Sequence, residues 1–147
     1  MPIVTKELVI IDSQDIEPRC VVGEEIRILA DHQQTGSYEI YQHDAEEGAG
    51  PPPHFHAWDE AFYVMEGEVD FVCGQISKTV KAGGFVHVPS GTTHSFRYAS
   101  KTAKMLGITS TGGAAAMFSA VDAATKEDPS MENVVATATK NGLNGVP

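Results

Sequence analysis

Three residues between positions 54 and 60 have the types and the spacing of metal ligands. His54 and His56 are separated by one residue, and Glu60 follows four positions after His56. Alternate side chains of a strand share one face, so the two histidines point the same way and Phe55 points the other way. Glu60 has the same parity, with a turn expected at 57–59. These residues predict part of a metal site.

A second polar segment, PSGTTHSFRY, contributes the fourth candidate ligand, His94. Together His54, His56, Glu60 and His94 can hold one divalent metal. Imidazole and carboxylate donors suit iron, nickel, cobalt, manganese, copper or zinc, and no thiolate narrows the choice. The remaining histidines at 32, 43 and 87 are isolated in the sequence, and we assign none of them to the metal.

The elements that must position these ligands are short strands separated by Gly and Pro. The predicted strands are EEIRILA, GSYEIYQHD, DEAFYVMEGEVDFVC, QISKTVKAG, GFVHVPSG, TTHSFRYA and AKMLGIT. Many short strands at this spacing predict an all-β sandwich or barrel with its core at about 24–110. We expect a single domain over 1–147, because this length suits one core and no linker interrupts it.

The character of the chain changes after Gly112-Gly113, where one or two packing helices are predicted at about 113–141. Met117, Phe118 and Val121 share one helical face. Asp128 is the expected N-cap of the second helix, with Pro129 at its first position.

The net charge of −10 is concentrated in one part of the chain. Between Arg27 and Lys78 there are ten acidic residues and no Lys or Arg. This argues against a nucleic-acid partner, which requires basic residues to neutralise phosphate, and it favours cations near the predicted site. No apolar run is long enough to span a membrane, and the N-terminus lacks the pattern of a signal peptide, so we expect a cytoplasmic protein.

Two longer patterns resemble the motifs of the cupin superfamily. Gly48 and Gly67 complete the first motif, G-x5-H-x-H-x3-E-x6-G, around the ligands already named. The second motif, G-x5-P-x-G-x2-H-x3-N, is matched from Gly83 to His94, but Tyr98 stands where the motif has Asn. The resemblance implies a double-stranded β-helix, or jelly-roll barrel, with His54, His56, Glu60 and His94 as metal ligands.

The surrounding residues resemble those of quercetinase-like bacterial cupins. PPPHFHAWDEAFYVMEGEVDF, GGFVHVPSGTTHSFRY and AKMLGITSTGGAAAMF carry this likeness. It implies a metal-dependent dioxygenase that cleaves a flavonol-like or other aromatic or enolic substrate with O2. In that reading Glu60 is also the catalytic base that accepts the proton of the substrate's hydroxyl group.

An apolar substrate pocket is predicted next to the ligands. Phe62, Val64, Phe96 and Tyr98 have the same parity as the ligands, while Arg97 points outward. A pocket for an anionic substrate would need Arg or Lys, so this lining favours an uncharged or aromatic molecule. The alternative for each of the four residues is a place in the barrel core.

Two other classes of function stay open at this level. One is a non-redox metal-dependent isomerase or lyase acting on a small polyol or keto acid. The other is a non-catalytic cupin that binds a ligand. The family resemblance also implies a homodimer, and Tyr63 and Met65 on the outer face of their strand agree with it because they need cover.

Overall fold

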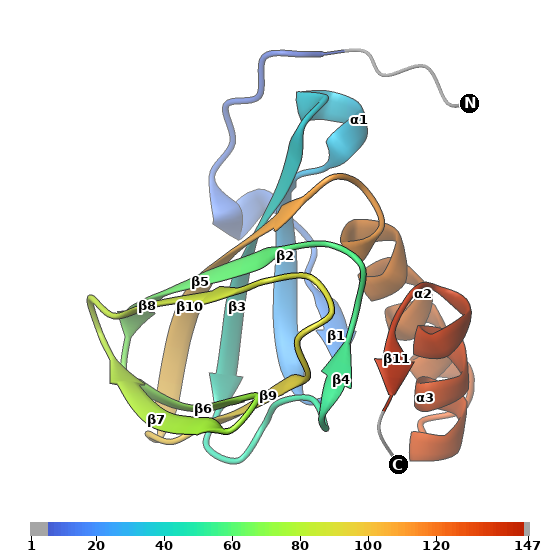
Figure 1. Cartoon of the computed structure of the whole chain (residues 1–147). Helices are drawn as coiled ribbons and strands as arrows, with labels where there is room; N and C mark the ends of the chain where they lie inside the picture. Colours follow the sequence, from blue (N-terminus) through green and yellow to red (C-terminus); the bar gives the residue numbers. More distant parts are fainter. Residues whose placement is uncertain (1–5, 146–147) are drawn as a thin grey trace.

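The strands form two antiparallel sheets that face each other, as a computed structural model describing residues 6–145 shows (Figure 1). The six-stranded sheet has the order β1 (Arg19–Val21), β2 (Glu24–Ala30), β3 (Tyr38–Glu46), β10 (Thr102–Ser110), β5 (Glu60–Glu66), β8 (Phe85–Val88). The five-stranded sheet has the order β11 (Asn144–Gly145), β4 (His54–Phe55), β9 (His94–Tyr98), β6 (Glu68–Cys73), β7 (Ile76–Lys81). The predicted jelly-roll barrel is confirmed.

The connections between strands contain residues that suit their backbone conformation. Gly67 joins β5 to β6 with φ +77°, a conformation that glycine adopts without steric cost. The short helix α1 (His32–Thr35) joins β2 to β3 and starts with a capping box between Asp31 and Gln34. A 3-10 turn at Ser13–Asp15 precedes β1. The sequence did not predict β1, because this strand is only three residues long.

Two helices follow the last long strand and pack beside β1 and β11 (Figure 1). The first is α2 (Ala114–Glu127), and its buried face contains the predicted Met117, Phe118 and Val121. The second is α3 (Met131–Lys140). No helix within residues 6–145 is long and apolar enough to cross a lipid bilayer.

The predicted start of the second helix was wrong. Ser130, not Asp128, is the N-cap, and its side chain accepts a hydrogen bond from the Asn133 backbone N–H at 3.3 Å. Asp128 ends α2 instead, and its carboxylate accepts a hydrogen bond from the Ser130 backbone N–H at 3.0 Å. Pro129 therefore lies between the two helices.

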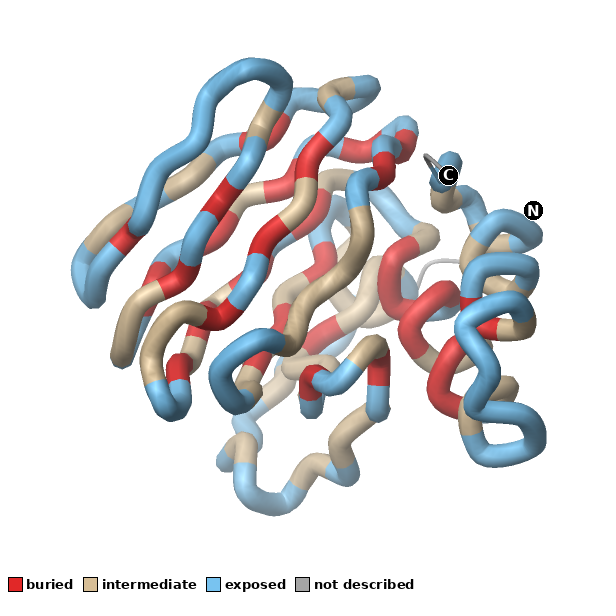
Figure 2. The backbone as a smooth tube through the Cα atoms, turned by 90° about the horizontal axis from the view of Figure 1, so that it is seen from below, coloured by how far each residue is buried: buried red, intermediate tan, exposed pale blue. Residues whose placement is uncertain are grey.

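The interior is divided into two apolar clusters. One, the barrel cluster, fills the space between the two sheets, and the other, the helix-side cluster, joins the barrel to α2 and α3. Buried segments accordingly follow the strands and the inner side of α2, whereas α3 is mostly exposed (Figure 2). The barrel cluster consists of Phe62, Val64, Val69, Phe71, Val80, Val88, Phe96, Tyr98, Ala103 and Met105. The helix-side cluster consists of Val21, Ile26, Tyr41, Trp58, Ala114, Ala115, Met117, Phe118, Val121 and Val134.

Candidate metal centre

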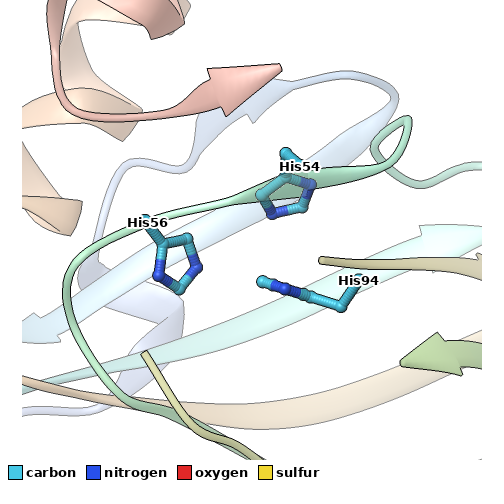
Figure 3. A group of neighbouring side chains, drawn as sticks. All are labelled: His54, His56 and His94. Carbon is cyan, nitrogen blue, oxygen red and sulfur yellow. The ribbon is translucent and has the colours of Figure 1, made fainter. Parts of the chain in front are cut away.

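The four predicted ligands come together in the interior of the barrel. His54 on β4 and His94 on β9 are directly opposite each other in the five-stranded sheet, and His56 follows immediately after β4. One ring nitrogen from each histidine lies within 4.8 Å of the others, and the three rings are turned toward one another (Figure 3). Glu60 begins β5 in the facing sheet, and its Oε1 lies 3.2 Å from His56 Nε2 and 3.3 Å from His94 Nε2.

Backbone carbonyl groups fix the orientation of all three imidazole rings. Nδ1 of His54 contacts the Pro52 carbonyl oxygen at 2.8 Å, and Nδ1 of His94 contacts the Thr92 carbonyl oxygen at 2.8 Å. His56 Nδ1 makes the same contact with the Trp58 carbonyl oxygen at 2.9 Å. A carbonyl oxygen only accepts hydrogen bonds, so each Nδ1 carries a proton, and Nε2 is the nitrogen left to hold a metal.

The electrostatics of the cluster fit a bound cation. Burial opposes ionisation of Glu60, but its contacts with His56 and His94 outweigh burial and lower its pKa to about 2. Burial and the neighbouring His94 lower the pKa of His54 to about 4, so this ring is neutral at pH 7. The three imidazoles therefore form one group, and the ionised Glu60 carboxylate lies beside two of them, a set of donors that suits a divalent transition metal.

The loops that carry the two motifs are bonded to each other. The Asp59 carboxylate accepts a hydrogen bond from the Ser90 backbone N–H at 2.9 Å. The Gly91 backbone N–H donates to the His56 carbonyl oxygen at 2.8 Å. The turn at 89–91 is thereby held against the segment 56–60, and His94 is brought back to the histidines of the first motif.

A cavity of about 80 Å³ opens onto the cluster and extends toward α2 and α3. Phe62 and Phe96, two of the predicted pocket residues, lie on its wall beside His54, His56 and Glu60. The other two, Val64 and Tyr98, are fully buried in the barrel cluster and do not line it. They point inward, as parity requires, but lie further along their strands from the ligands.

The helices supply much of the cavity wall, which the strand pattern did not predict. Met117, Phe118 and Val121 of α2 and Val134 and Val135 of α3 all line it. Among the described lining residues there is no Lys or Arg. Apart from a few histidine and glutamate side chains, the cavity wall is thus mostly apolar, and it suits an uncharged ligand.

Sequence reasoning missed three residues of the site. Trp58 stacks on His56, with ring centroids 4.5 Å apart and planes inclined by 10°. Glu24 and His43 also line the cavity. For His43 a signal was present: Tyr41 and His43 have the inward parity of β3, so its burial could have been predicted.

Comparison with known proteins agrees with the motifs. The family profile of the cupin domain matches residues 41–109. Quercetin 2,3-dioxygenase of Bacillus subtilis (strain 168) is 30% identical over 93 residues, which are 61% of this chain and 28% of that protein. The chain therefore matches little more than a quarter of the length of this relative.

Solved structures share the same fold at low sequence identity. A predicted oxalate decarboxylase from Thermotoga maritima superposes with a TM-score of 0.65 at 19% identity, covering 70% of this chain and 99% of that one. KdgF from Halomonas sp. gives a TM-score of 0.64 at 18% identity, covering 71% and 94%. The polyketide cyclase RemF from Streptomyces resistomycificus gives 0.61 at 22% identity, covering 71% and 80%. The family profile and the two motifs thus identify a cupin domain at residues 41–109, and the solved structures share its fold.

Proposed function

We propose that this cupin is a metal-dependent dioxygenase of the quercetinase type, which cleaves a flavonol-like or other aromatic or enolic substrate with O2. The observation that carries the proposal is the set of three histidines and one ionised carboxylate at the end of an apolar cavity. The likeness to quercetin 2,3-dioxygenase of Bacillus subtilis over 93 residues supports it.

In this proposal His54, His56, Glu60 and His94 hold the metal. When bound, a divalent metal supplies Lewis acidity, which lowers the pKa of a coordinated substrate hydroxyl group. The Glu60 carboxylate is ionised and lies beside His56 and His94, so it can accept the proton of that hydroxyl. Phe62 and Phe96 hold an apolar ring against the site and exclude water from it.

The stoichiometry of this reaction requires no additional reductant. In a dioxygenase both atoms of O2 enter the products, and the organic substrate supplies the electrons. The proposed partners are accordingly the substrate and O2 alone.

Oxygen uptake tests the proposal. The protein is loaded separately with Fe²⁺, Ni²⁺, Co²⁺ and Mn²⁺, and 3-hydroxyflavone or the single-ring hydroxyketone 3-hydroxy-2-methyl-4-pyranone is added. We expect uptake with at least one metal. Glu60→Gln should retain the metal and lose most turnover, whereas Glu66→Gln, on the exposed end of the same strand, should behave as wild type. Uptake with no metal, despite a filled site, contradicts the dioxygenase.

The size of the cavity favours a second candidate, a non-redox isomerase or lyase acting on a small polyol or keto acid. About 80 Å³ is well below the roughly 300–1,000 Å³ typical of sites for drug-sized ligands. A three-ring flavonol therefore requires α2 and α3 to move, whereas a small molecule does not. Turnover of a small substrate by the zinc-loaded protein under argon would favour this second function.

The outer face of the six-stranded sheet is the proposed surface of a homodimer. Tyr63 of β5 and Phe85 of β8 are paired in register, and Phe85 is 65% exposed. Met65 is also exposed on the same strand as Tyr63. We expect the wild type to elute as a dimer in size-exclusion chromatography with light scattering, and Phe85→Asp to shift it toward the monomer. A monomeric wild type contradicts this part of the proposal.

A further inference from the structure

A second charged cluster lies inside the barrel, separate from the candidate metal centre. Glu24 of β2 and His43 of β3 are both buried, and His43 is only 2% exposed. Glu24 Oε1 accepts hydrogen bonds from His43 Nδ1 at 3.0 Å and from the Tyr98 hydroxyl group at 2.7 Å. Because a carboxylate oxygen accepts, Nδ1 donates, and Glu24 fixes the orientation of the His43 ring.

The other nitrogen of His43 has no partner. Among the described residues, His43 Nε2 is the buried side-chain polar atom without a hydrogen bond. Buried polar groups are paired as a rule, so an unpaired nitrogen on a residue that lines the cavity indicates a missing partner. Phe62 and Phe118 contact the ring with their edges or faces and offer it no acceptor.

The neighbouring strand leaves room for this nitrogen. Gly107 of β10 lies between Tyr41 and Phe62 in the sheet, and a Cβ atom there would be 2.6 Å from His43 Nε2. Any larger residue at position 107 would therefore displace the ring. The absence of a side chain lets His43 lie over β10, on the side of the sheet that also carries Glu60.

The cavity connects the two clusters. Its wall contains Glu24 and His43 together with His54, His56 and Glu60. These five are the titratable side chains among the described lining residues, and most of the others are apolar. A ligand held at the metal centre therefore shares the cavity with one further pair of titratable groups, His43 and Glu24.

We propose that His43 is a substrate-binding residue, whose Nε2 hydrogen-bonds an oxygen atom of the ligand in the cavity, and that Glu24 is the positioning residue that holds the ring. The ligand class is an otherwise apolar molecule with a hydroxyl, enolate or carbonyl oxygen away from its metal-binding end. The inference rests on the proposed function only in placing the substrate in this cavity.

The charge around His43 agrees with this role. Burial by itself lowers the pKa of His43, but the adjacent Glu24 carboxylate outweighs burial and raises it. The protonated ring carries hydrogen on both nitrogens, so Nε2 then donates to the ligand oxygen while Nδ1 remains bonded to Glu24.

Two variants of His43 separate ligand binding from a purely structural role. An Asn side chain places its amide near the position of Nδ1 and can keep the bond to Glu24, but it lacks Nε2. A Gln side chain places its amide near Nε2 and loses the bond to Glu24. His87→Asn and His87→Gln are matched controls on an exposed histidine.

The measurement is calorimetric titration of the zinc-loaded protein under argon with 3-hydroxy-2-methyl-4-pyranone and with 3-hydroxyflavone. We expect His43→Asn to weaken binding of at least one probe about tenfold or more, the effect of losing one hydrogen bond to a charged group. His43→Gln should stay within about threefold of the wild type. Thermal stability should follow the opposite order, with His43→Asn the more stable variant.

Several outcomes would overturn the inference. These are wild-type affinity in His43→Asn, equal losses of affinity in both variants that parallel their stability, or no binding of either probe to the metal-loaded wild type. The proposed function fails separately. If His43→Asn binds a probe more weakly and His43→Gln does not, but no oxygen is taken up, the dioxygenase is removed and the role of His43 is retained. If oxygen is taken up and kcat/KM is unchanged in His43→Asn, the dioxygenase is retained and the role of His43 is removed.

Discussion

The Tyr98 hydroxyl group donates a hydrogen bond of 2.7 Å to the carboxylate of Glu24, across the interior from β9 to β2. This contact explains what the unusual residue of the second motif does in this chain. Tyr98 does not reach the cavity wall but fills the barrel cluster and anchors Glu24, which in turn orients His43. Tyr98, which replaces the Asn of the motif, therefore supports the Glu24–His43 pair. The four candidate ligands are unaffected by this replacement.

Tyr98→Phe should destabilise the protein without removing the metal. The variant keeps the ring in the core but deletes the donor to Glu24, at an expected cost of about 1–2 kcal/mol in the free energy of unfolding. Urea denaturation measures the cost, and Tyr63→Phe on the exposed outer face is the control. Equal stability of the two variants would show that the hydrogen bond to Glu24 does not stabilise the fold.

His94→Ala should lose the metal. His94 offers a ring nitrogen within 4.8 Å of those of His54 and His56, and removal of a ligand costs more than the roughly 10–100-fold typical of an outer partner. Competition with a chromogenic chelator should therefore show an affinity reduced more than about 100-fold. His87→Ala, which changes an exposed histidine, should retain the metal. Equal metal content in both variants would remove His94 from the site.

The stabilising contribution of His43 should decrease with rising pH. The Glu24 carboxylate, with help from Glu60 and Asp44, overcomes burial and raises the pKa of His43 above its ordinary value. The contribution is therefore fully present below about pH 6.5 and is lost as the pH rises through the folded-state pKa. The Tyr98 hydroxyl also faces Glu24, but burial raises the pKa of Tyr98, so it stays protonated throughout.

The measurement compares the unfolding free energies of the metal-free wild type and of His43→Asn from pH 6 to pH 9. We expect the advantage of the wild type to shrink across this range. A difference that is constant, or that grows with pH, would show that the ring is not protonated in the folded protein.

Glu39→Ala should loosen α2 from the barrel. The Glu39 carboxylate accepts hydrogen bonds from the Tyr41 hydroxyl at 2.9 Å and from the backbone N–H groups of Ala115 and His32 at 3.0 Å each. Removing this buried acceptor leaves donors unpaired, at a cost of about 2–4 kcal/mol in the free energy of unfolding.

Urea denaturation tests the size of this effect, and hydrogen exchange at the first turn of α2 tests its location. Glu46→Ala, at the exposed end of the same strand, is the control and should change neither. A loss of stability in Glu39→Ala with unchanged exchange in α2 would contradict a role in holding that helix.

Local patterns predicted the elements that carry the site. The alternation of side chains along a strand placed His54 and His56 on one face. The second motif placed His94 at the start of another strand. These are short-range properties, because they depend on backbone geometry over a few residues.

The cavity and its second charged cluster were not predictable in the same way. Parity places His43 on the inward face of β3, but it does not say which residues lie across the interior. The neighbours of His43 come from β2, from Gly107 on β10 and from Phe118 on α2. None of these is close to it in the sequence.

By itself, then, the sequence determined the short strands of an all-β domain, the C-terminal helices and the residue types of a metal site, since each follows from local spacing. Only the tertiary structure decided that Glu24 pairs with His43, that Tyr98 supports the pair and that α2 and α3 line the cavity. The physical reason is that burial and hydrogen-bond pairing depend on which strands and helices pack together. That packing is set by the whole chain.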